Sequence, residues 1–379
     1  MIPVYKPYLP SGSLDYAHKA LDSGWLSQGE YLIKAREMLS EIWGTEWIIL
    51  TNSGTSANHM IARTMRVKYP DKRNLVVPNN VYVAAWNPFI QEDFTLWPQD
   101  ADINTWNMDL GKRRWHMRDI EFKPSRTTIL LAVHNLGNTI NVPKWKKRWP
   151  DAVIIEDNCE GFGGMYGDPL QNSGTASEAF SMSFYGNKNL TTGEGGAFVT
   201  YDEDIYHYAH AFHGQGQANK KFIHNVAGYN YRMNNIQAAI LCGQLEIRSD
   251  IFEMKAALFD YYTNGFRSMD GVDLQYSQPN TKHSNWMFGI RLLGNKSYEE
   301  IKRFMDDAGI ETRPMFYPMS YHKHLHRDNN RNVARHYEDV AKQLSKEVVI
   351  LPSYPELTVV QQDFIIDKVG EYVQKYLLF

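Results

Sequence analysis

Short apolar runs alternate with helical patterns along the first part of the chain, and this alternation limits the possible folds more than any other feature. A helical pattern spans residues 30–43, and further helical patterns separate the later apolar runs. Runs that are apolar on both faces are typical of strands buried between two layers of helices. They lie at 47–50, 74–78, 127–133, 152–156, 179–185 and 196–200. We therefore predict an α/β fold with a mostly parallel sheet and helices on both faces.

The pattern changes after residue 231. One long helical stretch spans 232–262, where it would link two domains. Two strand–helix pairs follow it, with the strands at 285–293 and 347–352. This order predicts a large domain over 1–245 and a smaller α+β domain over 246–379.

Composition excludes several classes of protein. The chain has 40 basic and 43 acidic residues, a net charge of −3, so it lacks the basic surplus of a nucleic-acid binder. Hydrophobic residues make up 43% and charged residues 22%, which excludes general disorder, and two cysteines make no disulfide framework. The sequence opens without a signal-peptide pattern and has no apolar run of about 20 residues. We expect a cytoplasmic globular protein.

Three polar clusters follow predicted strands, where open parallel sheets bind ligands. Residues 53–57 (SGTSA) open a helix whose N–H groups suit a phosphate, although Ser or Thr there can simply cap the helix. Asp157 ends another strand, where it could hold a protonated heterocycle or cap the next loop. Lys188 lies between a buried strand and the Gly-rich turn 191–196; most lysines are solvated, but a desolvated one is a usable nucleophile. Together the clusters match the three groups that hold pyridoxal phosphate (PLP).

These motifs resemble the DegT/DnrJ/EryC1 family of sugar aminotransferases, which are PLP enzymes of aspartate-aminotransferase fold type I. The similar segments are GWLSQG (24–29), NSGTSA (52–57), VHNLGN (133–138), EDNCEGFGG (156–164), SFYGNKNLTTGEGG (183–196), GYNYRMNNIQAA (228–239) and RPMFYP (313–318). Within the family, FHGQG followed by GYNYRMNN is most similar to enzymes that aminate C4 of nucleotide-linked 4-keto-6-deoxy sugars.

The resemblance implies a role for each matching residue. Lys188 would carry the cofactor covalently, and Asp157 would pair with the pyridine nitrogen. The other implied cofactor contacts are Gly54, Thr55, Ser56 and Ser183 at the phosphate, Tyr82 stacked on the ring and Glu160 near the 3′-oxygen, and the implied sugar contacts are Trp25, Ser27 and Tyr317. Glu160 stands where many members have Gln, Leu136 where Tyr is common, and His213 where close relatives often carry Lys.

Assembly is also implied by the resemblance. The residue matching Asn230 reaches the phosphate bound by the other subunit of a homodimer, so two subunits would share each site. Asn230 could instead cap a helix beginning near Arg232. We favour the homodimer because a phosphate with about two negative charges needs more donors than one helix terminus supplies.

The implied activity is PLP-dependent transamination from L-glutamate to a nucleotide-linked 4-keto-6-deoxyhexose. The best match is conversion of GDP-4-keto-6-deoxymannose to GDP-perosamine, with dTDP- or UDP-4-keto-6-deoxyglucose as the alternative substrate. Related 3-dehydratases replace the lysine with His, and Lys188 argues against that chemistry. A non-catalytic PLP-fold binding protein is a more remote alternative. We expect no metal, because no Cys or carboxylate completes a set with His322, His324 and His326.

Overall fold

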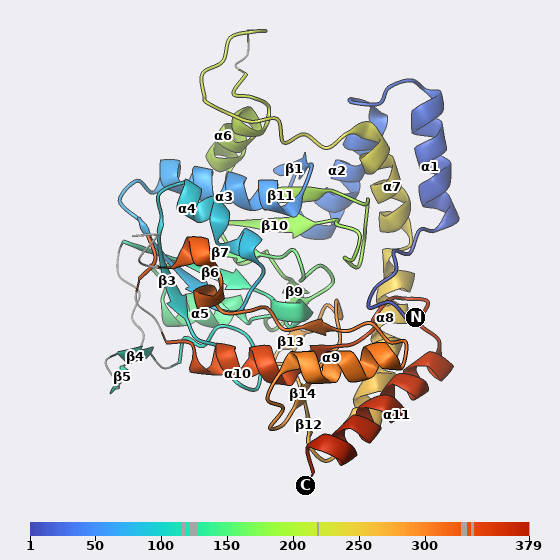
Figure 1. Cartoon of the computed structure of the whole chain (residues 1–379). Coiled ribbons are helices and arrows are strands. Elements are labelled where there is room, and N and C mark those ends of the chain that lie inside the picture. Colours follow the sequence, from blue (N-terminus) through green and yellow to red (C-terminus); the bar gives the residue numbers. More distant parts are fainter. Residues whose placement is uncertain are drawn as a thin grey trace.

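The centre of the molecule is a seven-stranded sheet (Figure 1). The computed structural model describes residues 1–111, 113–115, 118–120, 127–217, 220–326, 332–334 and 337–378. The strand order is β1 (Ile48–Thr51), β11 (Gly196–Thr200), β10 (Ala179–Ser183), β7 (Val153–Asp157), β6 (Thr128–Val133), β2 (Asn74–Pro78) and β3 (Thr95–Gln99). Strands β10, β7, β6, β2 and β3 are parallel, whereas β11 runs antiparallel to both its neighbours. The predicted α/β fold is confirmed.

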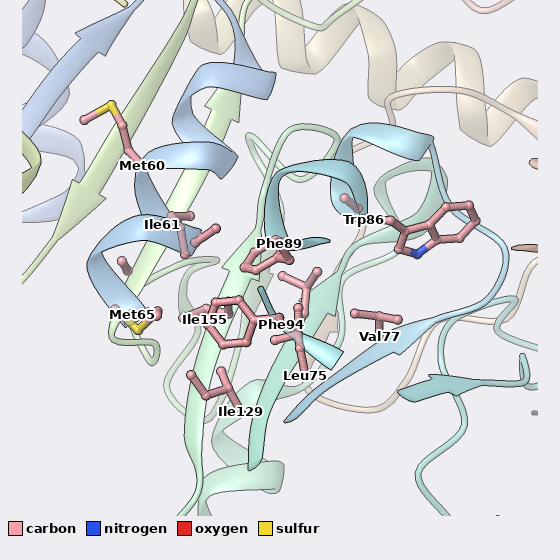
Figure 2. Packing of buried hydrophobic residues seen from close by; sticks show 14 of the residues in the cluster. Met60, Ile61, Met65, Leu75, Val77, Trp86, Phe89, Phe94, Ile129 and Ile155 are labelled. Atoms are coloured by element: carbon pink, nitrogen blue, oxygen red, sulfur yellow. The ribbon is translucent and has the colours of Figure 1, made fainter. Parts of the chain in front are cut away.

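Apolar side chains cover both faces of this sheet, as the sequence pattern predicts. On β6, Ile129 and Leu131 join the core under α3 (Gly54–Lys68), α4 (Asn87–Gln91) and α6 (Glu203–His213), part of which Figure 2 shows. Leu130 and Ala132 point to the opposite core, which includes α5 (Val142–Arg148). Successive strand residues alternate between the faces, so a strand with two apolar faces must lie between two layers.

A smaller antiparallel sheet forms the core of the C-terminal part of the chain. Its order is β12 (Val272–Leu274), β14 (Gly289–Leu292), β16 (Val348–Ile350) and β15 (Arg313–Pro314). The helices α9 (Tyr298–Asp307), α10 (Asp339–Glu347) and α11 (Val359–Tyr376) accompany it. Further elements include α1 (Ser11–Asp22), α2 (Glu30–Trp43), β4 (Arg113–Trp115), β5 (Arg118–Ile120), β8 (Met165–Tyr166), β9 (Gln171–Asn172) and β13 (Thr281–Lys282). None of the helices in the described residues is both long and apolar enough to span a membrane.

The long helix predicted over 232–262 is two helices. Helix α7 (Asn235–Glu246) and helix α8 (Arg248–Phe266) are separated by Ile247, which caps both. Helix α7 is pressed against α1, since a Cβ on Gly243 would lie 2.3 Å from the Ser13 backbone nitrogen. Helix α8 instead packs into the C-terminal core through Leu258, Tyr262 and Phe266. Because of this break, α7 packs in the core of the large sheet and α8 packs in the C-terminal core.

Lys255 on α8 is buried without a carboxylate partner in the described structure. Its Nζ donates to the backbone carbonyls of Trp286 (2.8 Å) and Ser353. Burial lowers the pKa of Lys255 from 10.5 to about 7. A neutral amine has two N–H donors, which match the two carbonyl acceptors, so this site is satisfied without a charge.

This burial predicts a specific pH dependence of stability. Between about pH 7 and 10.5 the unfolded chain binds a proton at Lys255 more readily than the folded chain, so the free energy of unfolding rises with pH in that window. From about pH 7 to 9.5, the wild type should gain roughly 3 kcal/mol relative to Lys255→Met. Urea unfolding at fixed protein concentration measures the difference. The exposed control Lys346→Met should follow the wild type, and parallel curves for Lys255→Met and wild type would contradict the expectation.

Candidate active site

A cavity of about 720 Å³ opens at the carboxyl ends of β1, β7 and β10. Predicted site residues from distant parts of the sequence line it together: Gly54, Thr55, Tyr82, Asp157, Glu160, Ser183, Lys188 and Tyr317. Strands that are parallel to one another end at the same sheet edge, and this topology brings the residues into one space.

Four predicted residues do not line this cavity within the described chain. The Ser56 hydroxyl is turned away and donates to Asn52 Oδ1 at 2.6 Å. Trp25 is 68% exposed, and Ser27 and Asn230 are also exposed outside the cavity lining.

The alternative interpretation of Asn230 as a helix cap is wrong. Helix α7 begins at Asn235, and its cap is Asn234, whose side chain accepts from the backbone N–H of Gln237. The Gln237 side chain in turn accepts from the Asn234 backbone N–H, which completes a capping box. Asn230 lies upstream of this cap and has no part in it.

The start of α3 is closely packed against the sheet. Ser53 caps the helix by accepting from the Ser56 N–H at 3.1 Å, so the capping interpretation of this segment is confirmed. A Cβ on Gly54 would lie 2.8 Å from the Ser183 Cβ and 2.9 Å from Cys159 Sγ. Only glycine therefore allows the helix N-terminus to approach the ends of β7 and β10. The exposed Thr55 lies at this N-terminus, which favours an anion.

Asp157 ends β7 and accepts from three donors. Its Oδ2 accepts from Asn58 Nδ2 at 2.8 Å, and its Oδ1 accepts from the Cys159 N–H at 3.1 Å and from the Ser181 hydroxyl at 3.3 Å. The second bond is the loop cap that the sequence allowed, and it coexists with a position in the cavity wall. The sequence analysis did not predict a role for Asn58. Its polar side chain on an otherwise apolar helix face could have indicated a buried polar partner.

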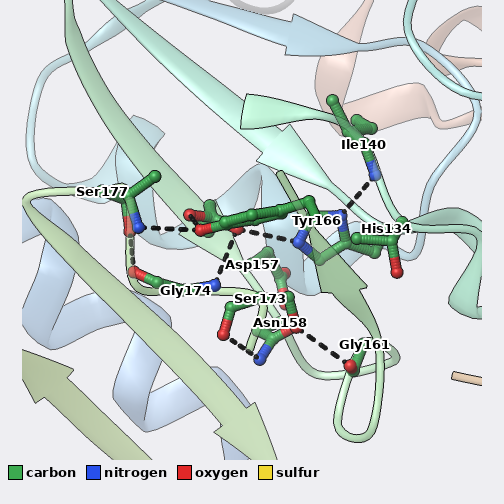
Figure 3. Close-up of polar contacts among 12 residues, drawn as sticks. His134, Ile140, Asp157, Asn158, Gly161, Tyr166, Ser173, Gly174 and Ser177 are labelled. Carbon is green, nitrogen blue, oxygen red and sulfur yellow. Dashed lines mark hydrogen bonds and ion pairs between the residues drawn. The ribbon is translucent and has the colours of Figure 1, made fainter. Parts of the chain in front are cut away.

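Buried polar contacts also support the residue before Asp157 (Figure 3). His134 Nδ1 accepts from the Ile140 N–H at 3.1 Å, so its proton lies on Nε2, which donates to Glu156 at 2.9 Å. Glu156 also accepts from the Tyr166 hydroxyl at 2.8 Å. These bonds satisfy a carboxylate that is fully buried, and they fix the end of β7 beneath the cavity.

Lys188 lies against an indole ring that the sequence analysis did not identify. Its Nζ is 3.8 Å from the centre of the Trp286 ring and 3.7 Å from Glu160 Oε1. Trp286 Nε1 donates to the backbone carbonyl of Asn187 at 2.8 Å, so Trp286 restrains both the lysine and the residue before it. A cation–π contact of this kind contributes about 0.5–2 kcal/mol. The two residues are far apart in sequence, and no local pattern pairs them.

Glu160 has an unusual protonation equilibrium. Burial raises its pKa to about 7, while Lys188 opposes and Asp157 reinforces that rise. Its Oε2 accepts from the Leu136 N–H at 2.9 Å. Glu160 can therefore gain or lose a proton near neutral pH beside the Lys188 amine.

The outer part of the cavity is aromatic and carries one more cation. Tyr82 lies 6.2 Å from Phe316, and Tyr317 stacks on Tyr321 at 5.2 Å between ring centres. Arg313, which was also not predicted, lies on β15 within the lining and is 3.9 Å from Glu311. Such a wall suits a ligand with flat rings and anionic groups.

The geometry of these residues fits PLP. Gly54 and Thr55 line the cavity at a helix N-terminus, whose N–H groups suit a phosphate, and the Ser183 hydroxyl lines the same cavity. Asp157 supplies a fixed carboxylate for a ring nitrogen, and Lys188 supplies an amine on a side chain that is only 13% exposed. Tyr82 supplies an aromatic face in the same cavity.

Known proteins have sequences and folds similar to those of this chain. Residues 9–370 match the model of the DegT/DnrJ/EryC1/StrS aminotransferase family. The chain is 31% identical over 376 residues to the GDP-perosamine synthase of Escherichia coli O157:H7, covering 98% of each protein. It is 28% identical over 371 residues to that of Vibrio cholerae, covering 94% of this chain and 95% of the relative.

Solved structures extend the similarity to the fold. A Helicobacter pylori aminotransferase involved in the biosynthesis of pseudoaminic acid has a TM-score of 0.88 at 21% identity, covering 98% of this chain and 99% of that one. A GDP-4-keto-6-deoxymannose-3-dehydratase variant with bound GDP-perosamine has a TM-score of 0.87 at 21% identity, with coverage of 97% and 100%. At these identities the similarity concerns the fold, which is that of type I aminotransferases.

Proposed function

Because this chain belongs to the DegT/DnrJ/EryC1/StrS family of PLP-dependent sugar aminotransferases, we propose that it aminates C4 of a nucleotide-linked 4-keto-6-deoxyhexose, with L-glutamate as donor. The preferred substrate is GDP-4-keto-6-deoxymannose and the product is GDP-perosamine. One observation carries the proposal: an amine, a fixed carboxylate and a helix N-terminus face the same cavity, at Lys188, Asp157 and Gly54. The full-length similarity to GDP-perosamine synthases supports the choice of sugar.

Each residue has a separate task in this proposal. When bound, PLP withdraws electrons from a substrate carbon that has lost a proton. The N–H groups of Gly54 and Thr55 and the Ser183 hydroxyl would hold its phosphate, and Tyr82 would supply an aromatic surface for its ring. The negative charge of Asp157 would favour a proton on the ring nitrogen, and Asn58 fixes the orientation of this carboxylate.

Lys188 is the proton carrier in this proposal. With PLP bound, the Lys188 Nζ would be the group that takes the proton from the amino donor's Cα and returns a proton on the cofactor side. The Trp286 ring keeps the free amine close to these atoms. A lysine that can move this proton favours transamination over the dehydratase chemistry of relatives that carry histidine.

The substrate is tested by direct product analysis. The purified protein is incubated with glutamate and a panel of GDP-, dTDP- and UDP-linked 4-keto-6-deoxy sugars, and products are identified by mass and NMR. We expect a GDP-linked 4-amino-4,6-dideoxymannose to form fastest. Preferential amination of a dTDP- or UDP-linked sugar would contradict the proposed substrate but not the reaction. A protein without a glutamate-bleachable visible band after addition of PLP would contradict the reaction itself.

Replacing Lys188 tests the proposed proton carrier. Lys188→Ala should abolish turnover, because the covalent attachment and the proton carrier are lost together, while PLP still binds through the phosphate seat. Turnover and cofactor content are measured on the same preparation, and retained amino transfer near the wild-type rate would refute the assignment.

Replacing Asp157 separates binding from chemistry. Asp157→Asn should leave PLP bound but raise the barrier of the glutamate half-reaction by about 3–4 kcal/mol, the size of an active-site electrostatic deletion. Stopped-flow absorbance of the single half-reaction measures the change. An unchanged rate would mean that another group holds the proton on the ring nitrogen.

We also propose a homodimer in which Asn230 completes the phosphate seat of the other subunit. Asn230 is exposed and lies outside the cavity lining of its own chain. The preceding segment, residues 220–229, projects beyond α6 (Figure 1). It carries Phe222, which is 76% exposed, and Ile223, which is 48% exposed. Large apolar side chains at such a position favour contact with a second copy.

Mixed dimers test this assembly. Lys188→Ala and Asn230→Phe should each be inactive as homodimers, because each lacks one part of every site. Co-expressed with two different affinity tags, they should regain activity in the heterodimer, where one of the two sites is intact. A fully active monomer, or an inactive purified heterodimer, would refute the shared site.

A further inference from the structure

The residues on either side of Asn230 are both tyrosines, and their rings are stacked. The rings of Tyr229 and Tyr231 lie 5.1 Å apart with an angle of 4° between their planes. Both rings also lie close to His59 of α3, at 5.4 and 5.8 Å between centres. In extended chain, neighbouring side chains point to opposite sides. The two rings therefore lie on the His59 side of the chain, where Tyr229 is still 50% exposed, and the exposed Asn230 between them lies on the opposite side.

The backbone around Asn230 is fixed from two directions. The Tyr231 N–H donates to the carbonyl of His213 at 2.9 Å, and the Tyr231 carbonyl accepts from the Asn52 N–H at 2.8 Å. The Asn230 Oδ1 accepts from the Arg232 N–H at 3.4 Å. Within the described chain, Asn230 Nδ2 donates to no protein group, so this donor is available to an acceptor from outside.

A directed chain of hydrogen bonds anchors Tyr231 to the body of the protein. The Tyr231 hydroxyl lies 2.7 Å from His59 Nδ1, and His59 Nε2 lies 3.0 Å from Glu92 Oε1. The Glu92 carboxylate accepts from His59 Nε2, so in a neutral imidazole the other nitrogen, Nδ1, accepts from the Tyr231 hydroxyl. Glu92 is held by Arg63 at 3.1 Å, so every donor in the chain has an acceptor.

The central residue of this chain of hydrogen bonds, His59, lies on α3, whose N-terminus would bind the phosphate. Gly54 and Thr55 at the N-terminus of α3 line the subunit's own cavity, and His59 lies about one turn further along. We propose that the Tyr231–His59–Glu92 chain is a positioning network that holds Asn230 outward for the PLP phosphate of the partner subunit. This inference rests on the homodimer proposed above. It makes α3 the support for a phosphate contact in both active sites of the dimer.

Removing one hydroxyl tests the network by cofactor binding. Tyr231→Phe keeps the stacked ring but leaves His59 Nδ1 without its donor, so Asn230 is held less firmly. We expect the dissociation constant for PLP, measured by absorbance titration of the apoprotein, to rise roughly 5- to 20-fold. The matched control is Tyr201→Phe, which removes a hydroxyl that donates to the Trp43 carbonyl at 2.8 Å, and it should leave PLP affinity unchanged. Equal PLP affinities for Tyr231→Phe and wild type would overturn the proposal.

A mixed dimer shows whether Tyr231 acts on its own site or on the partner's. In a heterodimer of tagged Lys188→Ala and Tyr231→Phe subunits, only the Tyr231→Phe subunit has Lys188. The active site that contains this Lys188 receives Asn230 from the other subunit, in which Tyr231 is intact. We expect borohydride to trap PLP on that lysine with wild-type concentration dependence, read by mass spectrometry of the tagged subunit. Affinity that stays as weak as in the Tyr231→Phe homodimer would overturn the proposal.

Variants at His59 keep the test decisive if Tyr231→Phe proves poorly folded. Gln can accept from Tyr231 and donate to Glu92, whereas Leu can do neither. His59→Gln should therefore bind PLP more tightly than His59→Leu, and equal affinities for the two would overturn the network. All these measurements read PLP binding alone, so an absence of sugar amination would refute the proposed function and leave this result standing. A monomer with full PLP affinity would refute the shared site and the network together.

Discussion

The close packing of helix α3 against the strand ends is the constraint on which the rest of the site depends. Gly54 fits between Ser183 and Cys159 with no room for a side chain. This contact sets the depth and rotation of the whole helix, because an α-helix repeats its faces every 3.6 residues. The first turn then lies at the cavity, Asn58 reaches Asp157 at 2.8 Å, and His59 reaches Tyr231 at 2.7 Å. If α3 lay further from the strand ends, both the Asn58–Asp157 and the His59–Tyr231 hydrogen bonds would be lost.

The fold was predictable because its cause is local. Strands β6 and β7 must be apolar on both faces to lie between two helical layers, and the sequence states this directly at 127–133 and 152–156. The break at Ile247 was not predictable, because both halves of 232–262 are good helical sequence. The helix breaks there because the side chains of α7 pack in one core and those of α8 pack in another.

The site divides in the same way. Asp157 and Lys188 could be predicted because each ends a strand or lies near a Gly-rich turn, which are local features. Their partners could not, because Asn58 and Trp286 reach them only through the tertiary fold. Asn230 is intermediate: its motif suggests a role at the partner's phosphate, which stays a prediction, and the start of α7 at Asn235 excludes only the capping interpretation. Sequence patterns thus find residues whose backbone position matters, and packing determines which groups orient them.

The charges of the cavity add a reason for a contribution from outside the subunit. Among the described residues of its lining, Asp157, Glu160 and Glu194 are carboxylates, whereas Lys188 and Arg313 are the cations. The proposed ligands are all anionic: a phosphate with about two negative charges, a dicarboxylate donor and a sugar diphosphate. One helix N-terminus carries about half a positive charge, too little to balance them. Glu160 can lessen the deficit by holding a proton near neutral pH, since its pKa is about 7. In the proposed dimer, the Asn230 amide of the other subunit would supply a further donor. Because Asn230 is exposed in its own subunit, that subunit does not have to bury an unpaired polar group.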